Sequence, residues 1–265
     1  MVVYTYRISY KFGDTIKIKP FYDVHYLNTN CDVKAAKKYL AKNDDENTYI
    51  IGGGDSMDSI IVSDAKRYRK SADAAKGEAI VDEAIDGVEE MLKPYKARVI
   101  GLASGNHEDA ILLKTNTDPI ARLCKRLECK NLGYSGLIRL ILSEGGSRGR
   151  TVVIRYHHGW GGGSRTQGAD LTKYSKDLAY WDADIFLYGH VHRKQADRVP
   201  RLGLSGEELI SKPKMECICG TFLKTYSKGI RPTYSEKAGY PPVEVGGLVV
   251  NIKPMQRWVD IWTDL

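Results

Sequence analysis

The sequence has no long apolar run and few cysteines, and each shortage excludes a class of protein. No stretch approaches the roughly 20 apolar residues that a membrane-spanning helix needs, so we expect no membrane partner. The five cysteines are an odd number at irregular positions: Cys31, Cys124, Cys129, Cys217 and Cys219. This pattern argues against a disulfide framework and favours a reducing compartment, so we expect a cytoplasmic protein.

Cys217 and Cys219 have no second cysteine pair with which to close a zinc site, so we expect both thiols on one face of a strand. The first seven residues lack a charged segment followed by an apolar core, and we expect no signal peptide. No internal repeat, low-complexity tract or boundary is evident along the 265 residues. We therefore predict a single domain over residues 1–265.

Positive charge is concentrated in the second part of the chain. Residues 1–110 carry 16 Lys/Arg and 18 Asp/Glu, a balance of −2, whereas residues 111–265 carry 24 and 15, a balance of +9. A basic region favours a polyanionic partner such as DNA or RNA. The alternative is a solvated basic surface without a partner, as we expect for the helical run Arg122, Lys125, Arg126 and Lys130.

Strand and helix patterns alternate along the chain. Residues 5–19 alternate polar and apolar side chains around Gly13-Asp14, which predicts a β-hairpin. Helices are predicted at 33–41, from about Ser71 to Leu92, after the Gly-Asn-His-Glu turn through Lys130, and at 169–181. Strands are predicted at 48–51, 97–102, 136–142, 151–156, 184–188, 214–218, 247–252 and 257–262. This order indicates a layered α/β domain, and the late strands suggest a second sheet packed on the first.

Histidine is the scarce residue whose placement is most informative. All six histidines lie in four short motifs: Asp23-Val-His25, Gly-Asn106-His107-Glu108, His157-His158-Gly and Gly-His190-Val-His192. A fifth motif, Gly54-Asp55-Ser56-Met57-Asp58, supplies a carboxylate between the first two. Each motif follows a predicted strand, and loops beyond strand ends converge in α/β sheets. Mixed oxygen and nitrogen ligands suit zinc, manganese or iron.

In this order the five motifs resemble the signature of the calcineurin-like metallophosphoesterases, over residues 23 to 192. The resemblance implies an α/β fold in which two mixed β-sheets pack between outer helices, a four-layer αββα sandwich. It also implies a hydrolase that cuts phosphoester bonds by attack of a hydroxide that bridges two divalent metal ions.

The resemblance also implies which side chains bind the two ions. One ion would be held by Asp23, His25, Asp55 and His192, and the other by Asp55, Asn106, His158 and His190, so that Asp55 bridges them. Manganese, iron and zinc all fit, and we favour manganese. His107 would stand beside the phosphate, where it would stabilise charge or protonate the leaving oxygen, and Glu108 would orient that imidazole.

Two positions depart from the simple pattern. The family places the ligand directly before glycine, which selects His158 rather than His157. Successive side chains at a strand end point opposite ways, so we expect His157 to be packed or to contact substrate. Asp58 fits the motif, and we expect it to support the site rather than to bind metal.

Two further segments are candidates for substrate binding. The glycine-rich loop 159–168 lacks the Gly-Lys-Ser/Thr ending of a P-loop. Its Arg165 would meet a substrate phosphate, unless the loop is only a flexible surface loop. Residues 224–240 interleave basic and aromatic side chains, which would stack bases and follow a phosphate backbone, or would form a loop packed over the sheet. They are Lys224, Tyr226, Lys228, Arg231, Tyr234, Lys237 and Tyr240.

We therefore predict a metal-dependent phosphoester hydrolase, and within that class a phosphodiesterase or nuclease acting on nucleic acid. One alternative is a phosphomonoesterase acting on a small molecule or a phosphoprotein, because one site serves many substrates. The other is an inactive scaffold with the same fold. Such a scaffold would be expected to lack some ligands, and here every position of the signature is filled.

Overall fold

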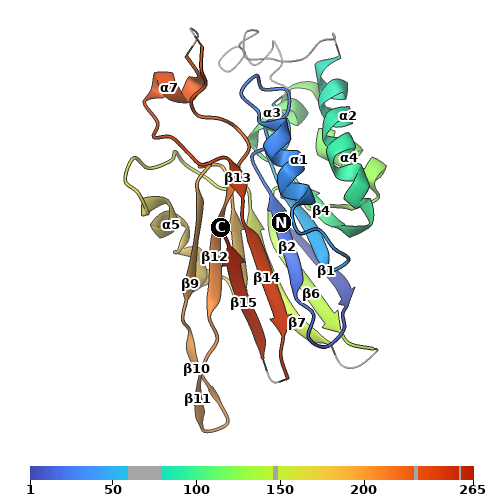
Figure 1. Cartoon of the computed structure of the whole chain (residues 1–265), viewed down its shortest axis with the longest axis vertical. Coiled ribbons are helices and arrows are strands. Elements are labelled where there is room, and N and C mark those ends of the chain that lie inside the picture. The colour runs from blue at the N-terminus through green and yellow to red at the C-terminus, as the bar shows by residue number, and fades with distance from the viewer. Residues whose placement is uncertain (59–78, 146–148, 230–231, 257) are drawn as a thin grey trace.

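The computed structural model describes residues 1–58, 79–145, 149–229, 232–256 and 258–265. Two β-sheets pack face to face around a shared apolar core, and helices cover both outer surfaces (Figure 1). The expected four-layer αββα sandwich is confirmed. Cys217 and Cys219 are both buried in the core between the sheets, as the single-face prediction requires.

Sheet 1 is mixed and contains seven strands. Its order is β1 (Val2–Ser9), β6 (Ser135–Ser143), β7 (Arg150–His157), β8 (Ile185–Tyr188), β12 (Lys214–Thr221) and β13 (Gly246–Gly247), with β9 (Lys194–Val199) also paired to β12. Strands β7 and β8 are parallel, so their carboxyl ends lie at the same edge. A separate hairpin of β10 (Leu202–Ser205) and β11 (Glu208–Ser211) projects beyond β9 (Figure 1).

Sheet 2 is also mixed and contains six strands. Its order is β15 (Val259–Asp264), β14 (Val249–Pro254), β2 (Ile16–Phe21), β3 (Thr48–Gly53), β4 (Val99–Ala103) and β5 (Lys130–Asn131). The four strands from β2 to β5 run parallel to their neighbours. The carboxyl ends of β2, β3 and β4 therefore lie at one edge of the sheet.

The predicted amino-terminal hairpin is wrong, although both of its strands exist. Strand β1 pairs with β6 in sheet 1, whereas β2 pairs with β3 and β14 in sheet 2. Ile8 of β1 and Ile16 and Ile18 of β2 are all buried in the core between the sheets. The turn at Gly13, whose φ is +97°, thus carries the chain from one sheet to the other. Alternation predicts strands, but burial of both apolar faces decides their partners.

Helices α1 (Val33–Ala41), α2 (Ile80–Leu92) and α4 (Pro119–Leu127) pack their apolar sides on the outer face of sheet 2. Asp32 caps α1, because its carboxylate accepts a 3.0 Å hydrogen bond from Ala35 N. Residues 71–78 of the predicted long helix lie outside the described residues. A 3₁₀ helix (Lys93–Arg98) and α3 (Asn106–Thr115) complete this side.

Sheet 1 carries α5 (Ala169–Tyr174) and α6 (Asp177–Tyr180) on its outer face, where a single helix was predicted. The short helix α7 (Tyr234–Ala238) stands above the sheets at the end where the loops converge (Figure 1). None of the helices in the described ranges is long and apolar enough to cross a membrane.

The basic run Arg122, Lys125, Arg126 and Lys130 is exposed, as the prediction of a solvated face requires. Arg122 forms an ion pair with Asp82 of α2, and Arg126 forms ion pairs with Asp86 and Glu89 of the same helix. The positive charge of these two arginines is therefore balanced within the fold.

Candidate metal centre

Loops from five strands meet at one edge of the sandwich and bring together all seven predicted metal ligands. Sheet 2 contributes the loops after β2, β3 and β4, and sheet 1 those after β7 and β8. The side chains are Asp23, His25, Asp55, Asn106, His158, His190 and His192, each close to at least one other member of the set.

Two glycines allow the loops after β3 and β4 to touch. Gly54 has a φ of +99°, and a Cβ there would lie 2.5 Å from Gly105 N. A Cβ on Gly105 would in turn lie 2.1 Å from Asp55 Oδ1. The carboxylate of Asp55 can therefore rest against the start of α3, where His107 N donates a 2.9 Å hydrogen bond to Oδ1.

Five of the seven predicted ligands have left-handed backbone conformations. The φ angles are 49° at Asp23, 51° at His25, 49° at Asp55, 69° at His190 and 59° at His192. Such conformations are uncommon for residues other than glycine, although Asp and His tolerate them better than most. They persist where surrounding contacts hold them, and they cluster at functional sites.

The first group of donor atoms surrounds His25. Its Nε2 lies 3.1 Å from His192 Nε2, 3.9 Å from Asp23 Oδ1 and 3.9 Å from Asp55 Oδ2. His192 Nε2 is also 3.6 Å from Asp23 Oδ1. These are the four residues that the resemblance assigned to one ion.

The second group surrounds His158. Its Nε2 lies 3.3 Å from Asp55 Oδ2, 3.0 Å from Asn106 Oδ1 and 3.4 Å from His190 Nδ1. His190 Nδ1 is 2.9 Å from Asn106 Oδ1. Asp55 Oδ2 is thus common to both groups, which is the arrangement that a bridging carboxylate requires.

The first group fits a divalent cation. Asp23 is fully buried; Oδ2 accepts a 2.8 Å bond from His190 N, while Oδ1 has no hydrogen-bond partner among the described residues. Burial raises the pKa of Asp23 to about 8, because an isolated buried carboxylate is costly. Burial lowers the pKa of His25 to about 4 and that of His192 well below its usual value. Neutral imidazoles facing a bare carboxylate oxygen form a metal-binding donor set.

The second group is organised by the Asp55–His158 pair. Burial alone would lower the pKa of His158, but the Asp55 carboxylate raises it to about 10. Burial would raise the pKa of Asp55, and the imidazoles of His158 and His107 outweigh it and hold that pKa well below the usual value. His158 Nδ1 lies 3.1 Å from the Gly53 carbonyl, which can only accept, so Nδ1 carries a proton and Nε2 faces the site.

His107 is oriented by Asp58, not by Glu108 as expected. His107 Nδ1 lies 2.5 Å from Asp58 Oδ1, and Asn28 Nδ2 donates a 2.5 Å bond to the other oxygen of Asp58. The opposite nitrogen, Nε2, lies 3.8 Å from Asp55 Oδ2. The sequence held the signal for this pair, because Asp58 is the second carboxylate of the Gly-Asp-x-x-Asp motif.

Glu108 supports the loop that carries Asp55, which corrects its predicted role. Its buried carboxylate accepts hydrogen bonds from four backbone N–H groups. These are Gly105 at 2.8 Å, Asp55 at 3.0 Å, Ser56 at 2.7 Å and Met57 at 3.2 Å. Both carboxylate oxygens are therefore engaged with the backbone rather than with an imidazole.

Neither predicted substrate contact lines the pocket above the site, within the part of the chain that the structure describes. His157 packs between the rings of Tyr134 and Trp160, with centroids 5.4 and 5.0 Å away, and its Nδ1 accepts a 2.8 Å bond from Gly159 N. Arg165 is exposed and donates a 3.5 Å bond to the Ala238 carbonyl. The packed alternative for His157 is the one the structure shows.

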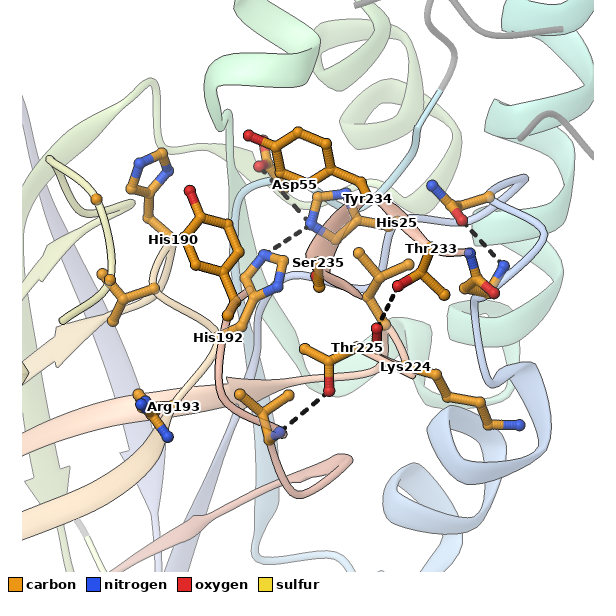
Figure 2. Close-up of a pocket in the computed structure, with 18 of the residues that line it drawn as sticks. His25, Asp55, His190, His192, Arg193, Lys224, Thr225, Thr233, Tyr234 and Ser235 are labelled. Carbon is orange, nitrogen blue, oxygen red and sulfur yellow. Dashed lines mark hydrogen bonds and ion pairs between the residues drawn. The ribbon is translucent and has the colours of Figure 1, made fainter. Parts of the chain in front are cut away.

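A pocket of about 500 Å³ opens above the two groups. Its floor contains His25, Asp55, Asn106, His107, His190 and His192. One wall is the loop 161–164, and the other is a segment that we call the rim, residues 223–229 and 232–243 (Figure 2). The rim contains most of the basic and aromatic run found in the sequence; Arg231 of that run lies outside the described residues.

No family model matches the sequence, and a search of curated proteins found no match. Among solved structures, a predicted phosphoesterase from Streptococcus pneumoniae is 13% identical over 95% of this chain and 99% of that chain, with a TM-score of 0.32. Vps29 of Entamoeba histolytica, crystallised with zinc, is 11% identical (95% and 98% covered, TM-score 0.36). A metallophosphoesterase from Sphaerobacter thermophilus is 11% identical (94% and 89% covered, TM-score 0.37).

Two of these three structures are named as phosphoesterases. At TM-scores this low the likeness itself carries no argument about this chain. The resemblance to the calcineurin-like metallophosphoesterases therefore rests on the order of the motifs and on the geometry of the seven side chains.

Proposed function

We propose that this chain is a phosphoester hydrolase that works with two divalent metal ions. One observation carries the proposal: seven side chains from five separate loops form two adjacent groups of donor atoms that share Asp55 Oδ2. Asp23, His25 and His192 would hold one ion, and Asn106, His158 and His190 the other. When bound, such a pair polarises a phosphoryl oxygen and supplies a water-derived nucleophile at neutral pH.

His107 is the residue best placed to act on the leaving group. It lines the pocket beside Asp55, and its Nδ1 forms an ion pair with Asp58, so Nε2 is the nitrogen directed at the site. A proton donated from Nε2 to the leaving oxygen would assist bond cleavage, and a retained proton would stabilise the charge that develops there. Asp58 would fix the orientation of the ring and favour its charged form.

We further propose that the substrate is a phosphodiester, and that nucleic acid is the favoured source. The balance of +9 over residues 111–265 supports a polyanionic substrate. Two cations from this part of the chain, Arg193 and Lys224, line the pocket itself. A phosphomonoester is the competing substrate, and the experiment below separates the two.

The test is elemental analysis of the purified protein, followed by turnover assays with added manganese, zinc or iron. We expect about two ions per chain. We also expect cleavage of an aryl phosphodiester and of single-stranded DNA to exceed cleavage of a nucleoside monophosphate. Absence of any stoichiometric transition metal after reconstitution would refute the two-metal proposal. A preference for the monophosphate would refute the diester assignment alone.

A further inference from the structure

The rim places an exposed aromatic ring over the candidate metal centre. Tyr234, the first residue of α7, is 76% exposed and yet lines the pocket together with His25 and Asp55. Figure 2 shows its ring directed from α7 into the pocket, on the side where Asp55 and His25 lie.

Tyr234 is held in place by a second tyrosine. Its ring and that of Tyr240 are 6.0 Å apart between centroids and meet edge to face, with planes inclined by 62°. The neighbouring hydroxyl of Tyr240 raises the pKa of Tyr234. An edge contact leaves most of the Tyr234 ring uncovered, as its exposure shows.

The rim is closed on itself by hydrogen bonds, so the ring is presented from an ordered support. Thr233 caps α7 by accepting a 3.0 Å bond from Glu236 N, and its hydroxyl also donates to the Thr225 carbonyl. Val243 N donates a 3.1 Å bond to Thr225 Oγ1. Where the rim begins, Lys224 N donates a 3.0 Å bond to Asn30 O in the loop after β2.

The pocket is larger and more apolar than a phosphate group alone needs. Apolar side chains form part of its walls: Val191, Leu223, Pro241 and Val243. Pockets that bury organic ligands combine such apolar surface with a few polar groups that fix orientation. Here the polar groups lie at the floor, where the phosphate would bind, and the apolar and aromatic groups lie above them.

We propose that Tyr234 stacks on a nucleobase carried by the phosphoester, so that the rim selects nucleotides over other phosphoesters. The inference rests on the proposed function of the floor and adds the class of substrate. A base has a planar π-face, and stacking on an aromatic side chain is tolerant of base identity. The cation Lys224 lies on the same rim, and it forms a 2.9 Å ion pair with Asp32. A free nucleotide and a single strand share this chemistry.

The experiment is calorimetric titration of the manganese-loaded protein with thymidine 5′-monophosphate and with deoxyribose 5-phosphate, which lacks only the base. We expect the nucleotide to bind at least about tenfold more tightly, in line with stacking on one base. In Tyr234→Leu the nucleotide should lose most of that advantage, while deoxyribose 5-phosphate binds as before. Tyr234→Phe, which keeps the ring, should retain the advantage.

The matched control is Tyr180→Leu. Tyr180 is 80% exposed on α6 and does not line this pocket in the described structure, so its loss should leave both affinities unchanged. Equal binding of the two probes to the unchanged protein would overturn the inference. So would an unchanged advantage in Tyr234→Leu, or binding of a phosphopeptide as tightly as the nucleotide.

Further experiments distinguish a free nucleotide from a single strand, and they test base recognition separately from the proposed hydrolase activity. A short oligothymidylate that binds more tightly than the mononucleotide, with a steep loss in added salt, identifies a strand; equal binding identifies a free nucleotide. Either result supports base recognition. Turnover of phosphoesters with no base preference would sink only the inference. A tenfold base preference without metal-dependent turnover of any phosphoester would sink only the proposed hydrolase.

Discussion

The floor and the rim of the pocket are built in opposite ways. On the floor, His25 and Asp55 are buried, as are Asp23 and His158 beside them, and the backbones of all four are tied to neighbouring loops. On the rim, Tyr234 is exposed and belongs to a helix of five residues. The floor projects from the ends of strands in both sheets, whereas the rim lies within the single connection between β12 and β13.

This difference indicates that the floor and the rim have separate functions, catalysis and substrate selection. A rigid, buried floor holds donor atoms at fixed separations, which catalysis by paired cations requires. Side chains on an exposed rim can be substituted with little effect on folding. The rim is therefore the part of the pocket that can be adapted to a particular substrate. We therefore expect changes on the floor to remove activity for every substrate, and changes on the rim to alter only discrimination between substrates.

Asp55→Ala should give the largest effect. The substitution removes the oxygen common to both donor groups and the acceptor of the His107 N–H. We expect activity and metal retention to be lost together, as measured by turnover and by elemental analysis. Asp86→Ala, at an exposed ion pair on α2, is the control and should change neither. An Asp55→Ala protein that kept both ions would show that this carboxylate does not bridge.

His107→Ala should separate chemistry from metal binding. The imidazole is held by Asp58 and faces the pocket, so its loss should leave both ions bound and reduce turnover by about 10²-fold or more. Asp58→Asn should give a smaller loss. Because the two residues act as a unit, the double variant should be no slower than His107→Ala alone. Additive losses would mean that Asp58 acts independently of His107.

Glu108→Gln should act on stability more than on chemistry. A neutral amide has one acceptor oxygen in place of two charged ones, so some of the four backbone N–H groups lose their partner. We expect unfolding free energy to fall by about 2 kcal/mol, measured by urea denaturation with a chelator present. A variant of normal stability with a hundredfold loss of turnover would restore Glu108 to the role of orienting His107.

The sequence predicted the floor well because its information is local. Each ligand lies in a short motif at the end of a strand, and the family resemblance that these motifs carry implies that Asp55 belongs to both groups. Roles that depend on the direction of a side chain were harder to predict from the sequence. Whether Asp58 or Glu108 reaches His107 depends on how the loop after β3 packs against the start of α3. The strand pairing of β1 and β2 depends likewise on long-range burial that alternation does not encode.

The rim was harder to predict for the same reason. A run of tyrosines and lysines fits a base-binding surface as well as a packed loop, and only its position over the floor favours the first. Tyr226 belongs to the packed part of this run. Its hydroxyl donates a 2.7 Å hydrogen bond to the Tyr240 carbonyl, so Tyr226 supports the rim rather than facing the floor. Composition left both alternatives open and did not indicate that Tyr234 and Tyr240 are the rings of this run that line the pocket.

The smallest effect is expected within the pair His157 and His158, adjacent residues where β7 ends. Strand β7 buries Tyr156 between the sheets and turns His157 toward Trp160 on the outer side, whereas His158 points at Asp55. His157→Phe keeps a ring against Trp160 and loses only the acceptor for Gly159 N. We expect unchanged metal content and turnover within about threefold of normal, which corresponds to under 1 kcal/mol. His158→Phe should instead lose an ion, and equal metal loss in both variants would show that the two imidazoles share the site.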